Sequence, residues 1–213
     1  MNKIHQIPVV LIILLALTAH AYSDKVISTY TKLNLNTDCM PLDDNTEEEA
    51  EQGGILLCKG YDTYPIYIKY GDLRESVHFG NLSQPFIDSA WESFNVWNSV
   101  STTFEWRLKK GKPVAVIHRA FLDNIDPETG NVSKKLQGQV LVVSSVATEE
   151  NKSIGCVIGL VDARANKDAN KLARSIADEI EIPAMCTTDG SLYRGKKGPT
   201  AASMNRSYPD KSQ

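Results

Sequence analysis

The chain has 213 residues and a formal net charge of −3, with 23 Lys and Arg against 26 Asp and Glu. This balance does not favour nucleic acid as a partner, because nucleic-acid binding usually requires a basic surface. The length suits one domain with a hydrophobic core and is short for two.

The first 21 residues have the pattern of a bacterial signal peptide. Lys3 and His5 form a short charged start, residues 9–17 are apolar, and Ala19-His20-Ala21 has the small residues of a cleavage site. The apolar run is shorter than the roughly 20 residues of a membrane span. We therefore expect cleavage after Ala21, no membrane span in the mature chain, and export to the periplasm or out of the cell.

All four cysteines follow the predicted signal peptide, and an even number in an oxidising compartment favours disulfides. Four cysteines allow three pairings. We favour Cys39–Cys58 with Cys156–Cys186 because each pair closes a local loop. A zinc site is the alternative, but the chain has no Cys-x-x-Cys and no nearby pair of histidines. Neither a metal nor a cofactor is therefore predicted.

The predicted domain begins with a β-hairpin that carries an acidic loop. A strand is expected over 27–35 and its return over 55–58, with the Cys39–Cys58 disulfide at the base. The loop between them carries six carboxylates: Asp43, Asp44, Glu47, Glu48, Glu49 and Glu51. Such a loop is most often only solvated, and a contact with a cation or a basic surface is the alternative.

Two more hairpins and a short helix follow. Alternating apolar residues predict four strands in two pairs: 66–70 with 73–79, and 103–108 with 113–122. The second pair is joined by Lys109-Lys110-Gly111-Lys112, which suits a charged turn. Between the hairpins, the apolar spacing from Ser83 to Trp97 favours a short helix whose aromatic side chains lie in the core.

The C-terminal part combines a hairpin with an amphipathic helix. Apolar runs predict strands over 139–147 and 154–161, and a helix is expected over 167–180 with Asn166 as its N-cap. The apolar stripe of this helix consists of Ala169, Leu172, Ala173, Ile176, Ala177 and Ile180. Residues 188–213 have hardly any large apolar side chain, which predicts a disordered basic tail.

These elements predict an α+β fold. It consists mostly of antiparallel β-sheet built of hairpins, with the C-terminal amphipathic helix packed on the sheet and a short central helix. One disulfide-stapled domain is expected over 22–187, and we expect it to be a monomer.

No catalytic, metal or nucleotide motif stands out, and no Ser lies in a Gly-x-Ser-x-Gly elbow. Three carboxylates could act as a general acid and base. Each also has an arginine as a simpler ion-pair partner: Asp72 with Arg74, Glu105 with Arg107, and Asp162 with Arg164. Asp72 and Arg74 are also candidate binding residues.

The most specific site hypothesis concerns His118 and Arg119, which lie within the apolar strand 114–121. Alternation places His118 on the same face as Val116, so we expect a buried histidine that is hydrogen-bonded to the backbone or to a carboxylate. In the alternative, Arg107 and Arg119 lie on neighbouring strands and converge with His118 around an anion.

Several short blocks of the sequence carry a resemblance. They are Cys58-Lys59-Gly60-Tyr61 leading to Tyr64-Pro65, Gly71-Asp72-Leu73-Arg74, Glu105-Trp106-Arg107, Ile117-His118-Arg119, and Asp162-Ala163 followed by Ala165-Asn166-Lys167-Asp168-Ala169-Asn170 with Cys186. In these blocks, over about Tyr30 to Cys186, the chain resembles a family of uncharacterised exported proteins common in alphaproteobacteria. The resemblance implies export and assigns no catalytic residue. The acidic insertion after Cys39 and the basic tail depart from the family pattern.

Three functions are open at this point. The first is an exported, non-enzymatic domain that binds an unknown protein or envelope component. The second is an inhibitor whose acidic loop plugs the basic active site of another enzyme. The third is a small hydrolase that uses two carboxylates.

Overall fold

The computed structural model describes residues 25–42, 52–150, 155–180, 186, 188 and 192–209. The expected signal peptide and the acidic loop 43–51 lie outside the described residues. Within the described part of the chain, no helix is long and apolar enough to cross a membrane.

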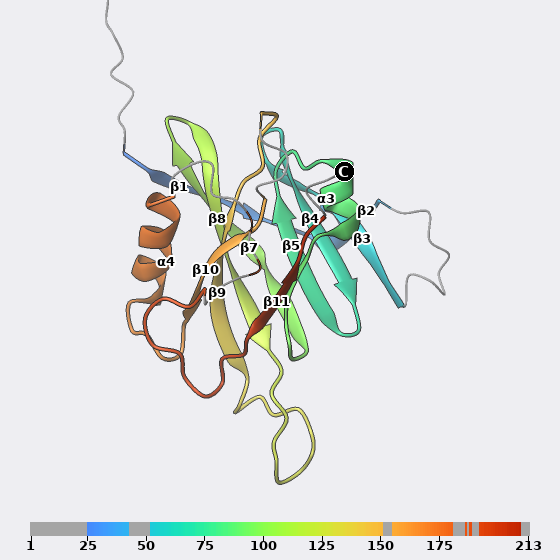
Figure 1. Ribbon diagram of the computed structural model, residues 1–213, viewed down its shortest axis with the longest axis vertical. Coiled ribbons are helices and arrows are strands. Elements are labelled where there is room, and N and C mark those ends of the chain that lie inside the picture. The colour runs from blue at the N-terminus through green and yellow to red at the C-terminus, as the bar shows by residue number, and fades with distance from the viewer. Residues whose placement is uncertain are drawn as a thin grey trace, which may run out of the picture.

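Two antiparallel β-sheets form the body of the protein (Figure 1). The first has the order β1-β7-β8-β9-β10, with β1 at Ile27–Lys32, β7 at Asn98–Lys109, β8 at Lys112–Leu122, β9 at Gly138–Ser145 and β10 at Val157–Asp162. The second has the order β2-β3-β4-β5, with β2 at Cys39–Pro41, β3 at Gly53–Tyr61, β4 at Tyr64–Gly71 and β5 at Arg74–Phe79. A two-stranded sheet pairs β6 at Trp91–Phe94 with β11 at Met204–Ser207. The helices are α1 at Leu35–Asp38, α3 at Gln84–Ser89 and α4 at Ala169–Asp178.

The main core lies between the two large sheets. Trp106 on β7 and Phe79 on β5 are fully buried there, and their rings meet edge to face at 5.8 Å. The indole Nε1 of Trp106 donates to Thr31 Oγ1 on β1 at 3.0 Å, so burial of this large side chain leaves its one donor satisfied. The prediction of a mostly antiparallel, hairpin-built β-fold with a few helices is confirmed.

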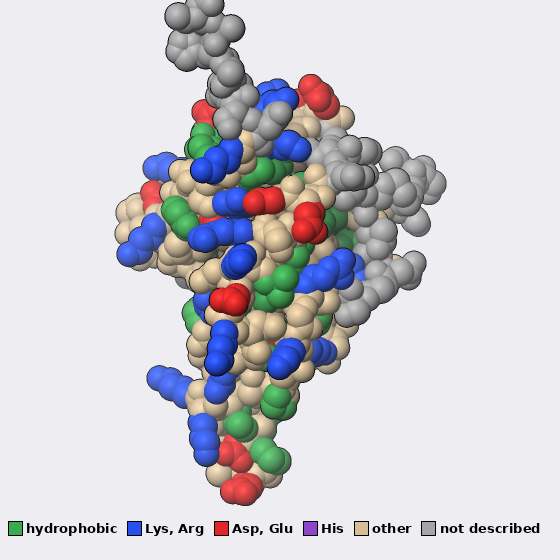
Figure 2. Space-filling model, turned by 90° about the vertical axis from the view of Figure 1, so that its left-hand side faces the viewer, with side chains coloured by type: hydrophobic (Ala, Val, Ile, Leu, Met, Phe, Trp, Pro, Cys, Tyr) green, Lys and Arg blue, Asp and Glu red, His purple; other side chains and the backbone are tan. Residues whose placement is uncertain are grey.

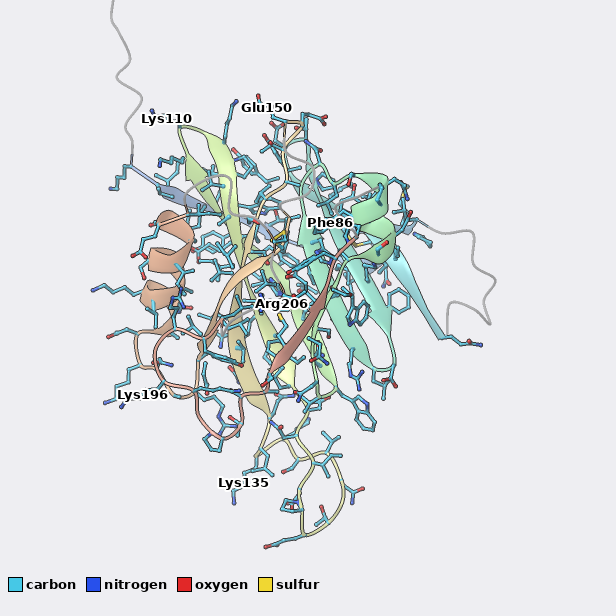
Figure 3. All side chains as sticks on the ribbon, viewed as in Figure 1. Phe86, Lys110, Lys135, Glu150, Lys196 and Arg206 are labelled. Atoms are coloured by element: carbon cyan, nitrogen blue, oxygen red, sulfur yellow. A yellow bond between two sulfur atoms is a disulfide. The ribbon has the colours of Figure 1, made fainter. Side chains whose placement is uncertain are left out.

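The predicted hairpins account for much of this arrangement. β4 pairs with β5, β7 with β8, and β9 with β10. The charged turn between β7 and β8 lies at the predicted residues, with Lys109 paired to Lys112. Its Lys110 lies at the opposite end of the molecule from Lys135, which precedes β9 (Figure 3).

The first hairpin differs from the expectation. β1 pairs with β7 in the other sheet, and β2 is the strand that pairs with β3. The residues Cys39 and Cys58 face each other across β2 and β3 and form a disulfide, and Cys156 and Cys186 form the second, as the favoured pairing predicted. Cys156 comes just before β10 and not within it.

The C-terminal helix α4 packs on the outer face of the first sheet. Ala173 and Ala177 are fully buried against this sheet, and their small side chains allow the helix a close approach. The helix is shorter than expected and begins after Asp168, whose side chain makes no capping hydrogen bond. Asn166, the expected N-cap, instead donates from Nδ2 to the carbonyl oxygens of Asp162 and Lys196.

The predicted helix from Ser83 to Trp97 is wrong beyond Ser89. The helix α3 ends there, because Ala90 takes an extended conformation and the ammonium of Lys69 donates to the carbonyls of Ile87 and Ala90 at 2.8 and 2.7 Å. The next residues form the strand β6.

The prediction that residues 188–213 form a disordered tail is also wrong for residues 192–209. Their strand β11 pairs with β6 in the register Met204↔Phe94 to Ser207↔Trp91. Tyr193 and Met204 pack against buried residues of β8, β9 and β10. A segment with few large side chains is therefore held by strand pairing and by contacts with an existing core.

Candidate functional site

Arg107 forms an ion pair beneath α4. Its Nε and Nη2 donate to the two carboxylate oxygens of Asp178 at 2.8 and 2.6 Å, and its Nη1 donates to Ser28. Glu105 lies 3.6 Å from the same guanidinium. Arg107 therefore joins β7 to α4 and is not available as an anion site.

The expected convergence of Arg107, His118 and Arg119 does not occur. His118 points into the space between the sheets, where its ring lies 5.9 Å from that of Phe104. Arg119 is on the other face of β8 and donates to Gln139 Oε1 at 2.9 Å. Neighbouring residues on a strand point to opposite faces, so His118 and Arg119 cannot both line one site here.

The α4 side of the molecule nevertheless has a basic character. Lys and Arg side chains are spread over this face, with Asp and Glu among them (Figure 2). The exposed Lys167 and Lys171 belong to the segment that contains α4. The buried Arg107 adds nothing to this surface.

The candidate carboxylates have structural partners. Asp72 pairs with Arg74 at 3.1 Å in the turn between β4 and β5. Glu105 accepts from Arg174 of α4, at 2.6 Å from its Nε. Asp162 accepts from the backbone N–H groups that follow β10, and it does not pair with the side chain of Arg164. These contacts favour a structural role for each carboxylate over acid–base catalysis.

The geometry points instead to a pocket between the two large sheets, which we call the inter-sheet pocket. It has a volume of about 250 Å³. Its walls come from α1, β3, β4, β5 and the start of β7: Leu35, Leu56, Ile68, Tyr70, Glu75, Val100, Ser101 and Thr102. Leu35 and Thr102 are exposed, whereas Ile68 is buried, so the pocket runs from the surface into the sandwich.

The pairing of β7 with β8 is irregular beside this pocket. The register between β7 and β8 shifts between Val100 and Phe104, so the intervening residues do not continue the regular ladder. Irregular pairing of this kind re-aims side chains and is common beside binding sites. On the opposite wall, the Tyr70 ring lies across Gly54, where a Cβ would come within 2.7 Å of the Tyr70 hydroxyl. Glycine is needed there to let the ring lie close to β3.

Glu75 is the charged residue of the inter-sheet pocket. Its Oε2 accepts from the Val100 N–H at 2.6 Å, and its own N–H donates to Asn98 Oδ1 at 3.3 Å. Burial raises the pKa of the Glu75 carboxyl above its usual 4.5, an effect that the Val100 hydrogen bond partly opposes. The carboxylate is thus held in place and poorly solvated.

A second, very small cavity lies deeper in the sandwich. Glu75 and Val100 line both spaces, and the inner one, about 10 Å³, is also lined by Glu92, Asn98 and His118. That volume suits about one water molecule. His118 has a buried Nδ1 with no hydrogen-bond partner among the described residues, contrary to the expected bond to backbone or carboxylate. Burial, with a smaller contribution from His78, lowers the pKa of His118 to about 3.

Beside this cavity lies a buried polar cluster of Ser76, His78, Glu92 and Tyr208. His78 Nε2 accepts from Ser76 Oγ at 3.0 Å, and its Nδ1 lies 3.1 Å from the Gly155 carbonyl and 3.5 Å from Glu92. Glu92 accepts from the Tyr208 hydroxyl at 2.6 Å. A Ser–His–Glu order resembles a catalytic triad, but Ser76 is 1% exposed and its Oγ accepts from the Glu92 N–H. The cluster therefore ties β5, β6 and the C-terminal segment together.

Sequence reasoning missed the inter-sheet pocket, although one signal was available. By alternation along β5, Glu75 shares a face with Val77 and Phe79, which are both buried. A carboxylate in line with two core residues indicates either a buried partner or a ligand site. Asn98 and Val100 are long-range hydrogen-bond partners of Glu75. Their places in the sequence give no comparable signal.

The fold and the site define a disulfide-linked β-sandwich with a small pocket between its sheets and a carboxylate in the pocket wall. Within the described residues, no group of three or more His, Cys, Asp or Glu is placed to hold a metal ion. The chain matches no protein-family model, and no curated protein or solved structure is significantly similar to it.

Proposed function

We propose that the protein is an exported, non-enzymatic binding protein whose inter-sheet pocket takes a small, largely apolar ligand. Two disulfides are typical of a protein that works outside the cytoplasm. The observation that carries the proposal is the pocket itself, in which Leu56, Ile68 and Val100 supply apolar walls beside the Glu75 carboxyl and a few hydroxyls. Ligand sites in proteins commonly have this composition.

The size of the pocket limits the ligand. About 250 Å³ is somewhat below the range typical of drug-sized ligands, so the pocket suits a compact aromatic or aliphatic group. Such a group could be a free molecule or the apolar end of an envelope component. The acidic loop, on which an inhibitor function would depend, lies outside the described residues.

The test is binding of prodan, a neutral naphthalene dye whose emission shifts to the blue in apolar surroundings. The mature protein with both disulfides should bind it at one site. Val100→Phe places a larger side chain at the pocket wall and should weaken binding at least about tenfold. Val132→Phe adds the same side chain at an exposed loop position and should not change binding.

Folding of both variants is checked by circular dichroism and thermal unfolding. Should Val100→Phe not fold, Thr102→Phe replaces it, because Thr102 is exposed at the pocket mouth. Equal prodan binding by a folded pocket variant and the wild type would overturn the proposal, as would no binding to the wild type.

A further inference from the structure

The Glu75 carboxylate is the charged group in the lining of the inter-sheet pocket, and it is only partly satisfied. The Val100 N–H donates to one of its oxygens. Among the residues that the structure describes, no Lys, Arg or His lies within ion-pair distance of Glu75. The neighbouring Arg74 pairs with Asp72 in the turn. A carboxylate beside apolar walls, with one hydrogen bond and no cation, is left in need of an opposite charge.

The other polar groups near the pocket do not offer that charge. Tyr70, Ser101 and Thr102 contribute neutral hydroxyls to the lining. In the cavity beyond Glu75, Glu92 is a second carboxyl and Asn98 is neutral. His118 is buried there, its Nδ1 has no hydrogen-bond partner within the described ranges, and its depressed pKa keeps it uncharged near neutral pH. An anionic ligand head would therefore meet carboxylates and no cation.

We propose that the inter-sheet pocket selects ligands in which a compact apolar group carries an amine, and that the ammonium pairs with the Glu75 carboxylate. This inference rests on the proposed function, because it names the ligand class of the same pocket. The apolar part contacts Leu56, Ile68 and Val100, and the ammonium donates to the carboxylate oxygen that the Val100 N–H does not use. A hydrogen-bonded ion pair in a poorly solvated site is stronger than one at the surface.

The experiment compares two probes that share an apolar body, naphthylmethylamine and naphthylmethanol. Their dissociation constants are measured by displacement of prodan and by calorimetry at pH 7. Wild-type protein should prefer the amine by about tenfold or more, which corresponds to about 1.4 kcal/mol. Glu75→Gln keeps an acceptor for the Val100 N–H but removes the charge, so it should abolish this preference and still bind the alcohol.

Glu128→Gln is the matched control, because Glu128 is exposed in a loop far along the chain from the pocket residues. This variant should keep the wild-type preference. Acidification offers a second readout: as the pH falls through the raised pKa of Glu75, amine binding should weaken and alcohol binding should not.

The outcomes separate the two proposals. Equal affinity of the wild type for both probes, or a preference that survives Glu75→Gln, would overturn the amine inference and leave the pocket as a binding site. Absence of binding by either probe or by prodan would overturn the proposed function, and the amine inference with it.

Discussion

Acid should destabilise the fold through its buried histidines, and His118 offers the cleanest test. This residue is 4% exposed and packs against the rings of Phe79 and Phe104. Burial lowers its pKa from 6.5 to about 3, so the native protein keeps the imidazole neutral where the unfolded chain protonates it. Between these two pKa values unfolding takes up one proton at this residue, and the free energy of unfolding falls as the pH falls.

The size of the effect follows from proton linkage. Each proton taken up on unfolding changes the free energy of unfolding by about 1.4 kcal/mol per pH unit. His118 alone therefore accounts for a fall of about 3 kcal/mol over roughly two pH units below 6.5. His78 acts in the same direction, because burial lowers its pKa to about 4. Glu92 acts in the opposite direction, because burial raises its pKa to about 7. Its contribution to the free energy of unfolding is present at low pH and is lost as the pH rises through that value.

The measurement is urea unfolding of the wild type and His118→Leu across this pH range, followed by tryptophan fluorescence. His78 and Glu92 are present in both proteins, so the difference between the two curves isolates His118. At pH 7 the variant should be at least as stable as the wild type, because an apolar side chain removes a buried nitrogen that has no hydrogen-bond partner among the residues described. Val132→His, which adds an exposed histidine, should leave the pH dependence unchanged. An unaltered pH dependence in His118→Leu would refute this reasoning.

Three further predictions concern stability. Arg107→Ala should lower the free energy of unfolding by about 2 to 4 kcal/mol in urea titrations, because it leaves Asp178 of α4 without its buried partner. Arg119→Ala should lower it by less than about 1 kcal/mol. Equal losses in the two variants would contradict the role of Arg107 as a buried ion-pair partner. Replacing Cys156 and Cys186 with Ser should lower the free energy of unfolding by about 3 to 4 kcal/mol relative to the oxidised wild type, because the unfolded chain gains loop entropy. An unchanged free energy of unfolding would count against a structural disulfide. Deleting residues 204–213 should lower the melting temperature, because β11 and the Tyr208 hydrogen bond are lost; a disordered tail would leave it unchanged.

Elements whose partners are close in sequence could be predicted. The strands of the β4–β5 hairpin are joined by a turn at Asp72 and Leu73, which both have positive φ, and the pairing follows from the chain reversal. The C-terminal hairpin and α4 were found in the same way, because the alternation and helical spacing lie within single stretches. Local pattern was sufficient wherever the contact that stabilises an element was also local.

The errors occur where the stabilising partner is distant. The residues Trp91–Phe94 have spacing that suits a helix, but β11, more than a hundred residues later, pairs with them as a strand. The two mistakes, a helix that is too long and a tail without structure, therefore have one cause. Tertiary pairing overrides local propensity, and a single sequence does not show which segments meet.

Two polar residues of the interior, Glu75 and His118, are consistent with the binding function that we propose. Glu75 and His118 are both unfavourable for folding: one is a poorly solvated carboxylate, and the other has a buried nitrogen without a hydrogen-bond partner in the described part of the chain. Apolar residues of similar size would fill the same space without the free-energy cost of burying polar atoms. Local violations of this kind are expected at functional sites, where the loss of stability is offset by interaction with a ligand. Because both residues line the cavity beyond Val100, and Glu75 also lines the inter-sheet pocket, a ligand that satisfies Glu75 should raise the melting temperature of the wild type more than that of Glu75→Gln.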